Sequence, residues 1–141
     1  MKIFFIFNLK NEMFNTYRNT PSVLYNYFYN IYHNDKTNLN CKNSLFKEVS
    51  NKFNKEYLDL KIYLNMHYKM RYSKKYDNHI INDIFNDEIS ILRIKKSYIV
   101  INSNSNYSEF FSILNNYYKT CLVCDFNNQN YFYLSDIKTL V

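Results

Sequence analysis

Three cysteines are the residues best suited to metal or redox chemistry, and Cys121 and Cys124 form a C-x-x-C pair. Such a pair holds zinc or exchanges a disulfide only when both thiols reach one point. The pair lies in an apolar run that predicts a strand, and strand residues three apart point to opposite faces. No second C-x-x-C is present, and Cys41 is remote in the sequence. We therefore expect buried, inert cysteines, with no metal and no cofactor.

Acid–base catalysis would need histidines or carboxylates at recognisable spacings. His33, His67 and His79 share no metal-ligand spacing. The acidic residues between Asp83 and Glu88 lie beside a loop-to-strand junction, where surface charge is the ordinary outcome. No nucleophile and base stand in a recognisable arrangement, so we expect the protein not to be an enzyme.

The 141-residue chain contains no glycine. Phosphate-cradling loops, dinucleotide fingerprints and nucleophile elbows all require backbone positions that glycine supplies, so these functions are disfavoured. Left-handed turn positions must then be occupied by other residues. We expect asparagine there, because it tolerates positive φ better than most side chains.

Composition predicts one folded domain over residues 1–141. The chain is 47% hydrophobic and 20% aromatic, and its net charge of +6 favours acidic partners such as nucleic acid, anionic membranes or acidic proteins. The apolar start ends at Asn8 without a cleavage site, and no run approaches the roughly 20 apolar residues of a spanning helix. We expect a cytoplasmic protein with reduced cysteines and no membrane association.

Periodicity predicts the elements that must position any site. Residues 3–9 predict an interior strand, 11–18 a short helix, and Thr20-Pro21 the start of a longer one. Residues 43–53 suggest a further helix. From Leu58 to Met70 apolar residues alternate with polar ones, which predicts a long strand with one wet face.

The second half of the chain predicts two hairpins and a helix between them. The hairpins cover 88–102 and 121–134, and the helix begins with a capping-box-like pair, Asn106 and Glu109. Short turns between strands favour antiparallel pairing. The predicted fold class is therefore α+β: a mainly antiparallel sheet of five to six strands with three to four helices, in a two-layer sandwich.

Two surfaces could bind a partner. Lys69 to Tyr76 interleaves basic and aromatic residues, as nucleic-acid patches do, although a lysine-rich loop has the same composition. Phe14 and Tyr17 lie three apart on the short helix and precede Arg18. A short helix rarely buries two aromatics, so one should face outward, as at the centre of protein interfaces.

The chain also resembles a known family in several segments. The early residues that carry the likeness are Glu12-x-Phe14, Tyr17 and the run from Ser22 to His33. Later ones are Phe110-Phe111, Asp125-Phe126-Asn127, Tyr131 and Leu134. These segments are similar to SirA, the sporulation inhibitor of replication of endospore-forming Firmicutes, over nearly the full length.

The resemblance implies a small cytosolic α+β protein that binds the N-terminal domain of the replication initiator DnaA and inhibits initiation during entry into sporulation. Phe14 and Tyr17 match the two aromatics of the family's first contact helix, with a spacing one residue shorter. A second contact patch would fall at Leu45 and Glu48, where the family has a glutamine and a tyrosine. The resemblance implies no small-molecule substrate and no direct contact with nucleic acid.

Three other functions remain open at this point. The first is a basic nucleic-acid-binding module that uses the Lys69–Tyr76 stretch. The second is an interaction protein with some other partner, such as a phage or mobile-element product. An enzyme is the third.

Overall fold

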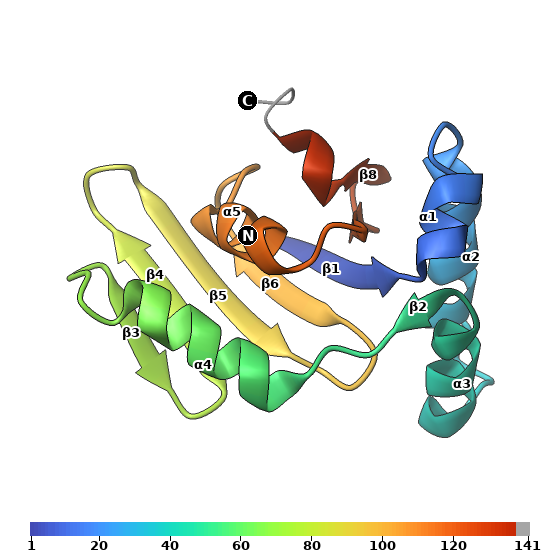
Figure 1. Cartoon of the computed structure of the whole chain (residues 1–141), viewed down its shortest axis with the longest axis horizontal. Helices are drawn as coiled ribbons and strands as arrows, with labels where there is room; N and C mark the ends of the chain where they lie inside the picture. The colour runs from blue at the N-terminus through green and yellow to red at the C-terminus, as the bar shows by residue number, and fades with distance from the viewer. Residues whose placement is uncertain (138–141) are drawn as a thin grey trace.

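One antiparallel sheet organises the chain, in the order β3-β4-β5-β6-β1-β7-β8, with the short β2 paired to β1 (Figure 1). The computed structural model describes residues 1–137. Its strands are β1 (Lys2–Leu9), β2 (Ser50–Asn51), β3 (Tyr72–Lys75), β4 (Asn78–Asp83), β5 (Glu88–Ile94), β6 (Ile99–Ser103), β7 (Cys121–Asp125) and β8 (Asn130–Tyr133).

Helices flank this sheet at two places. The α-helices are α1 (Asn11–Thr16), α2 (Pro21–Tyr32), α3 (Leu39–Val49), α4 (Lys55–Met66) and α5 (Glu109–Tyr117), and a 3₁₀ turn, η1, covers Leu134–Asp136. In Figure 1, α4 and α5 lie in front of the sheet, whereas α1, α2 and α3 gather at its right-hand end.

Strand β1 separates two hydrophobic cores, because its successive side chains point to opposite faces. Phe4 and Ile6 lie in the core beneath α4 and α5. Phe5 and Phe7 lie in the other core with the apolar faces of α2 and α3. The ring of Phe7 stacks on that of Phe28 from α2 at a centroid distance of 3.8 Å. The prediction of an interior strand over 3–9 is therefore confirmed.

The α+β class and the antiparallel sheet are confirmed, with eight strands in place of five or six. Beside β4 and β5 the arrangement is two-layered, since α4 covers one face of the sheet. At β1 and β7, helices pack on both faces. In the described part of the chain, no helix is long and apolar enough to span a membrane.

The predicted strand over 58–70 is wrong, because most of this segment is the helix α4. Its N-cap is Asn54, whose side-chain oxygen accepts a hydrogen bond from the backbone nitrogen of Tyr57 at 3.1 Å. Leu58, Ile62 and Met66 recur every four residues and are fully buried. Leu60 and Leu64 lie between them on the solvent side of the helix, so apolar residues occur at every second position, as they would in a strand.

The observed bounds of other elements also differ from the predicted ones. The helix expected over 43–53 is α3, which begins four residues earlier. The hairpin of β3 and β4 forms the left-hand edge of the sheet in Figure 1 and was not predicted, since its strands are short. Helix α5 begins at Glu109 with Ser108 as its N-cap, so Asn106 does not cap it.

The left-handed positions fall on residues other than asparagine. In the described residues, positive φ is found at Tyr76, Asp87 and Gln129, each in a hairpin turn. Asparagine instead supports the turns with its side chain: the amide of Asn128 donates to the carboxylate of Asp125 at 2.8 Å. The expectation that asparagine adopts these conformations is wrong.

Cys121 and Cys124 are buried on opposite faces of β7, as predicted. Burial raises the pKa of both thiols, so the reactive thiolate is suppressed. Cys41 lies exposed on α3. Among residues 1–137, no group of three His, Cys, Asp or Glu side chains is placed to hold a metal ion.

Candidate docking surface

Helix α1 projects from the end of β1 at the right of the molecule in Figure 1. The backbone nitrogen of Lys10, just before α1, donates to the carbonyl oxygen of Val49 at the end of α3, at 3.0 Å. This bond joins the start of α1 to the end of α3. The two helices that carry the predicted contact residues are therefore neighbours.

Phe14 and Tyr17 are both half-buried, so neither ring is sealed inside and neither is fully exposed. Both pack against the core beneath α2 and α3. The ring of Phe14 rests against that of Tyr133 at a centroid distance of 5.0 Å. The hydroxyl of Tyr133 donates to the backbone oxygen of Tyr17 at 2.5 Å. One tyrosine of β8 thus supports both predicted residues.

Arg18 is held by contacts on two sides. Its guanidinium donates two hydrogen bonds to the Asp136 carboxylate, at 2.6 and 3.0 Å. The hydrogen bond to Asp136 raises the pKa of Arg18. The same group lies 5.3 Å from the ring centroid of Phe14 and 4.9 Å from that of Tyr133, within cation–π range. Arg18 therefore braces Phe14 instead of projecting freely.

Leu45 and Glu48 lie on α3, Leu45 half-buried and Glu48 exposed. Both contact Tyr27 of α2. Its hydroxyl donates to the backbone oxygen of Leu45 at 2.9 Å and to the Glu48 carboxylate at 3.4 Å. Burial, followed by the charge of Glu48, raises the pKa of Tyr27. This bonding fixes α3 against α2.

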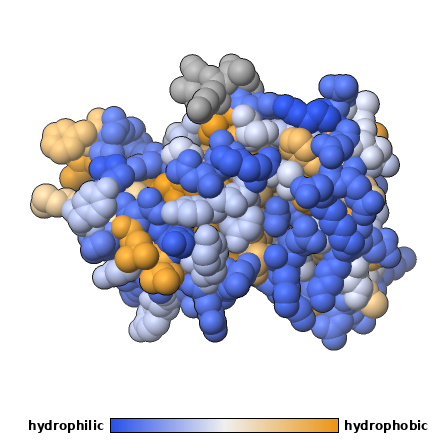
Figure 2. All heavy atoms as spheres, viewed as in Figure 1, coloured by the Kyte–Doolittle hydropathy of each residue, from blue (hydrophilic) through white to orange (hydrophobic). Residues whose placement is uncertain are grey.

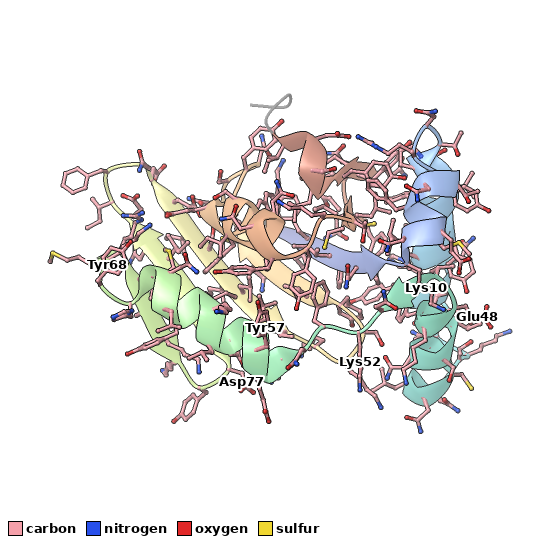
Figure 3. All side chains as sticks on the ribbon, viewed as in Figure 1. Lys10, Glu48, Lys52, Tyr57, Tyr68 and Asp77 are labelled. Carbon is pink, nitrogen blue, oxygen red and sulfur yellow. The ribbon has the colours of Figure 1, made fainter. Side chains whose placement is uncertain are left out.

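All five predicted residues thus lie on the helical end of the molecule, in two groups. Phe14, Tyr17 and Arg18 meet around Tyr133, whereas Leu45 and Glu48 meet around Tyr27. The bond between Lys10 and Val49 is the link between the two groups, and Figure 3 shows Lys10 and Glu48 at neighbouring positions there. We refer to the five residues together as the α1–α3 surface.

Three supporting residues were missed by sequence reasoning: Tyr27, Tyr133 and Asp136. Tyr27 lies half-buried on α2, and nothing in the sequence marks its hydroxyl bonds to α3. Tyr133 and Asp136 lie more than 110 residues from their partners, Tyr17 and Arg18. Nothing in the local pattern marks such contacts.

A buried network elsewhere has the residue types of a catalytic triad. His79 is fully buried; one ring nitrogen lies 2.6 Å from Asp59 and the other 2.7 Å from the hydroxyl of Tyr72. Burial raises the pKa of Tyr72 to about 12, and burial also lowers the pKa of His79. The Tyr72 hydroxyl is enclosed, so a substrate could not reach it. The network instead connects Asp59 of α4 to His79 and Tyr72 of the sheet.

The basic stretch from Lys69 to Tyr76 divides into two parts. Arg71 donates to Glu109 at 2.6 and 2.8 Å, and Lys69 lies 3.6 Å from the same carboxylate. The remaining lysines lie on the edge strand β3, where exposed positive charge discourages pairing with other sheets. The charge of this stretch is therefore either neutralised by Glu109 or placed on the edge strand, where it protects the sheet from pairing with other sheets.

A family model described as sporulation inhibitor of replication protein SirA matches residues 2–138. The chain belongs to the SirA family. The match includes every segment on which the sequence resemblance was based. A search of curated proteins returns no match. The SirA name connects the fold to the inhibition of replication at sporulation.

Proposed function

We propose that this SirA-family chain inhibits replication initiation by binding the N-terminal domain of the initiator DnaA through the α1–α3 surface. The observation that carries the proposal is the mounting of Phe14, a half-buried ring held between Tyr133 and Arg18. Aromatic residues and arginine on a rigid support are typical of interface hot spots. Family membership provides the link to replication.

Inhibition of this kind requires occupancy and no chemistry. A rigid surface that covers part of an initiator domain blocks any other factor that uses the same area. Preorganised anchors favour such binding, because little side-chain entropy is lost on docking. Both Phe14 and Arg18 are already restrained in the free protein. The inhibitor would therefore act by binding to the initiator, with no contact to the origin.

Direct nucleic-acid binding is less well supported. Of the basic residues in the stretch from Lys69 to Tyr76, Lys69 and Arg71 already pair with Glu109. A phosphate would have to compete with that carboxylate. The net charge of +6 is also compatible with an acidic protein partner.

Calorimetric titration with the N-terminal domain of the host DnaA tests the proposal. We expect saturable binding with one domain per chain. A parallel titration with duplex DNA should give only weak binding that disappears as salt is raised. The proposal fails if the domain does not bind while DNA binds tightly with a steep dependence on salt.

A further inference from the structure

Helix α4 carries a row of hydrophobic side chains on the side that faces away from the sheet. Figure 2 shows apolar side chains on the viewer-facing surface of this region, and Figure 3 labels Tyr57 and Tyr68 toward the two ends of α4. Their exposed fractions range from 43% for Tyr57 to 71% for Tyr68. We call this row the α4 outer face; its members are Tyr57, Leu60, Tyr63 and Leu64 of α4 together with Tyr68 in the turn just after the helix.

This outer face is additional to a complete inner face. Leu58, Ile62 and Met66 are fully buried and already anchor α4 on the sheet. A surface helix ordinarily has one apolar side and one polar side, and a helix that is apolar all round is buried on all sides. Leucine and tyrosine on the solvent side of α4 therefore indicate a second contact beyond the chain itself.

The spacing of the outer face matches a helix–helix seam. Tyr57, Leu60 and Leu64 are separated by three and then four residues, which is the spacing of the a and d positions of a heptad. His67 and Tyr68 occupy the next positions along the same row. Such a row packs against another helix more readily than against an irregular surface.

We propose that the occupant is a second copy of this chain, with the two α4 helices packed antiparallel across a two-fold axis. In that arrangement Leu60 of one copy lies opposite Leu64 of the other, and the reverse contact follows from symmetry. Tyr57 then faces the segment around Tyr68. The row is self-complementary, because it has an aromatic residue toward each end and leucines in the middle.

Charge supports the antiparallel arrangement. Glu56 is exposed at the start of α4 and takes part in none of the ion pairs found among residues 1–137. Lys69 lies just beyond the other end of the helix, where it pairs with Glu109 at 3.6 Å, so Glu56 of a second copy would share this lysine with that carboxylate. With Leu60 opposite Leu64, Glu56 of one copy lies opposite Tyr68 and next to Lys69 of the other, while Lys55, which lies opposite Lys69, is already paired with Asp59 and Asp77. Antiparallel packing also aligns the two helix dipoles favourably.

The area of the α4 outer face indicates how tightly two copies should associate. A fully exposed aromatic side chain presents on the order of 200 Å², so five side chains that are about half exposed present roughly 500 Å². Two copies would bury about 1,000 Å², which is near the lower limit for a specific interface. We therefore expect a reversible dimer with a dissociation constant on the order of 10–100 µM.

The dimer would leave the α1–α3 surface free, because α4 lies at the opposite end of the sheet in Figure 1. Each dimer would then present two such surfaces. If the proposed function holds, one dimer could engage two initiator molecules, and its avidity would rise where initiators cluster. Self-association itself does not depend on the identity of the partner.

Sedimentation equilibrium over a range up to about 300 µM tests the proposal. We expect a monomer–dimer equilibrium in the wild type and at least tenfold weaker association for Leu60→Glu and Leu64→Glu. The control is Ile84→Glu, an aliphatic residue in the β4–β5 turn that is 86% exposed, against 53% for Leu60 and 49% for Leu64, and it should associate as the wild type does. A wild type that stays monomeric throughout, or an unchanged dimer in both α4 variants, overturns the proposal.

Disulfide trapping tests the register without relying on a charged substitution. In a Cys41→Ser background, Leu60→Cys and Leu64→Cys proteins are oxidised separately and as a mixture. Antiparallel packing predicts that the mixed product between the two variants dominates. Equal or greater yields from each variant alone would contradict this register. Binding of the DnaA domain, measured on the same Leu60→Glu protein, separates failure of the dimer from failure of the proposed function.

Discussion

The guanidinium of Arg18 donates two hydrogen bonds to the carboxylate of Asp136, which lies 118 residues later in the sequence. The contact ties the turn after α1 to the 3₁₀ turn η1 that follows β8. The same guanidinium lies against the ring of Phe14. The position of the candidate hot spot is therefore set partly by the far end of the chain.

Replacing Arg18 with alanine should affect binding more than stability. The ion pair is about 40% exposed, and surface pairs of this kind contribute roughly 0.2–1 kcal/mol. The substitution also removes the support beside Phe14, so affinity for the DnaA domain should fall at least tenfold. Urea unfolding and calorimetry measure the two effects. Arg93→Ala, which removes another exposed arginine paired with Asp77, is the control and should leave affinity unchanged.

Stability should fall on mild acidification because of His79. Burial lowers the pKa of His79 below its ordinary value of 6.5, with the bond to Asp59 opposing this in part. Above pH 6.5 the imidazole is neutral in both states; below it, the unfolded chain takes up the proton more readily. The free energy of unfolding should thus decrease from pH 6.5 downward, until the lower pKa of the folded state is passed.

Urea unfolding at several pH values measures this slope. His79→Gln should flatten the slope below pH 6.5, although it also lowers stability at pH 7. An identical slope in His79→Gln would assign the pH dependence to other groups. At lower pH, Asp59 contributes in the same direction: burial would raise its pKa, but hydrogen bonds from Lys55 and His79 outweigh burial and lower it.

The hydroxyl of Tyr72 should stabilise the same network. Tyr72→Phe keeps the ring but leaves a nitrogen of the buried His79 without a partner, which costs about 1–3 kcal/mol. Thermal unfolding checks the loss. Tyr76→Phe in the neighbouring turn removes an exposed hydroxyl and should change stability little. Equal effects of the two substitutions would show that the buried bond is energetically unimportant.

Sequence patterns predicted those parts of the fold in which the apolar residues of a segment are also its buried residues. The run 3–9 is apolar on both faces and forms the strand between the two cores. Thr20-Pro21 correctly predicted the start of α2, which begins at Pro21. These segments could be recognised because burial and local periodicity agree.

The pattern failed where burial and hydrophobicity disagree. In α4 the residues Leu60 and Leu64 are exposed, yet they contribute to the alternation as strongly as the buried Leu58 and Ile62. A sequence alone does not show which apolar residues face solvent. The error therefore coincides with the surface to which we assign a second copy.

The candidate site was predictable only in part. Phe14 and Tyr17 were found from their short helix, and the family resemblance added Leu45 and Glu48. The residues that support Tyr17 and Arg18, Tyr133 of β8 and Asp136 of η1, could not be found, because these contacts arise from the packing of segments more than 110 residues apart. The structure therefore adds the residues that support Phe14 and Tyr17, which the sequence had indicated.

Affinity of Phe14→Ala for the DnaA N-terminal domain tests the central claim most directly. The control is Phe85→Ala, which removes a fully exposed phenylalanine in the β4–β5 turn, far from α1. As a hot spot, Phe14 should cost at least about 2 kcal/mol of binding free energy when truncated, while the control binds as the wild type does. A loss within about 0.5 kcal/mol for a folded Phe14→Ala protein would contradict the assignment of this surface.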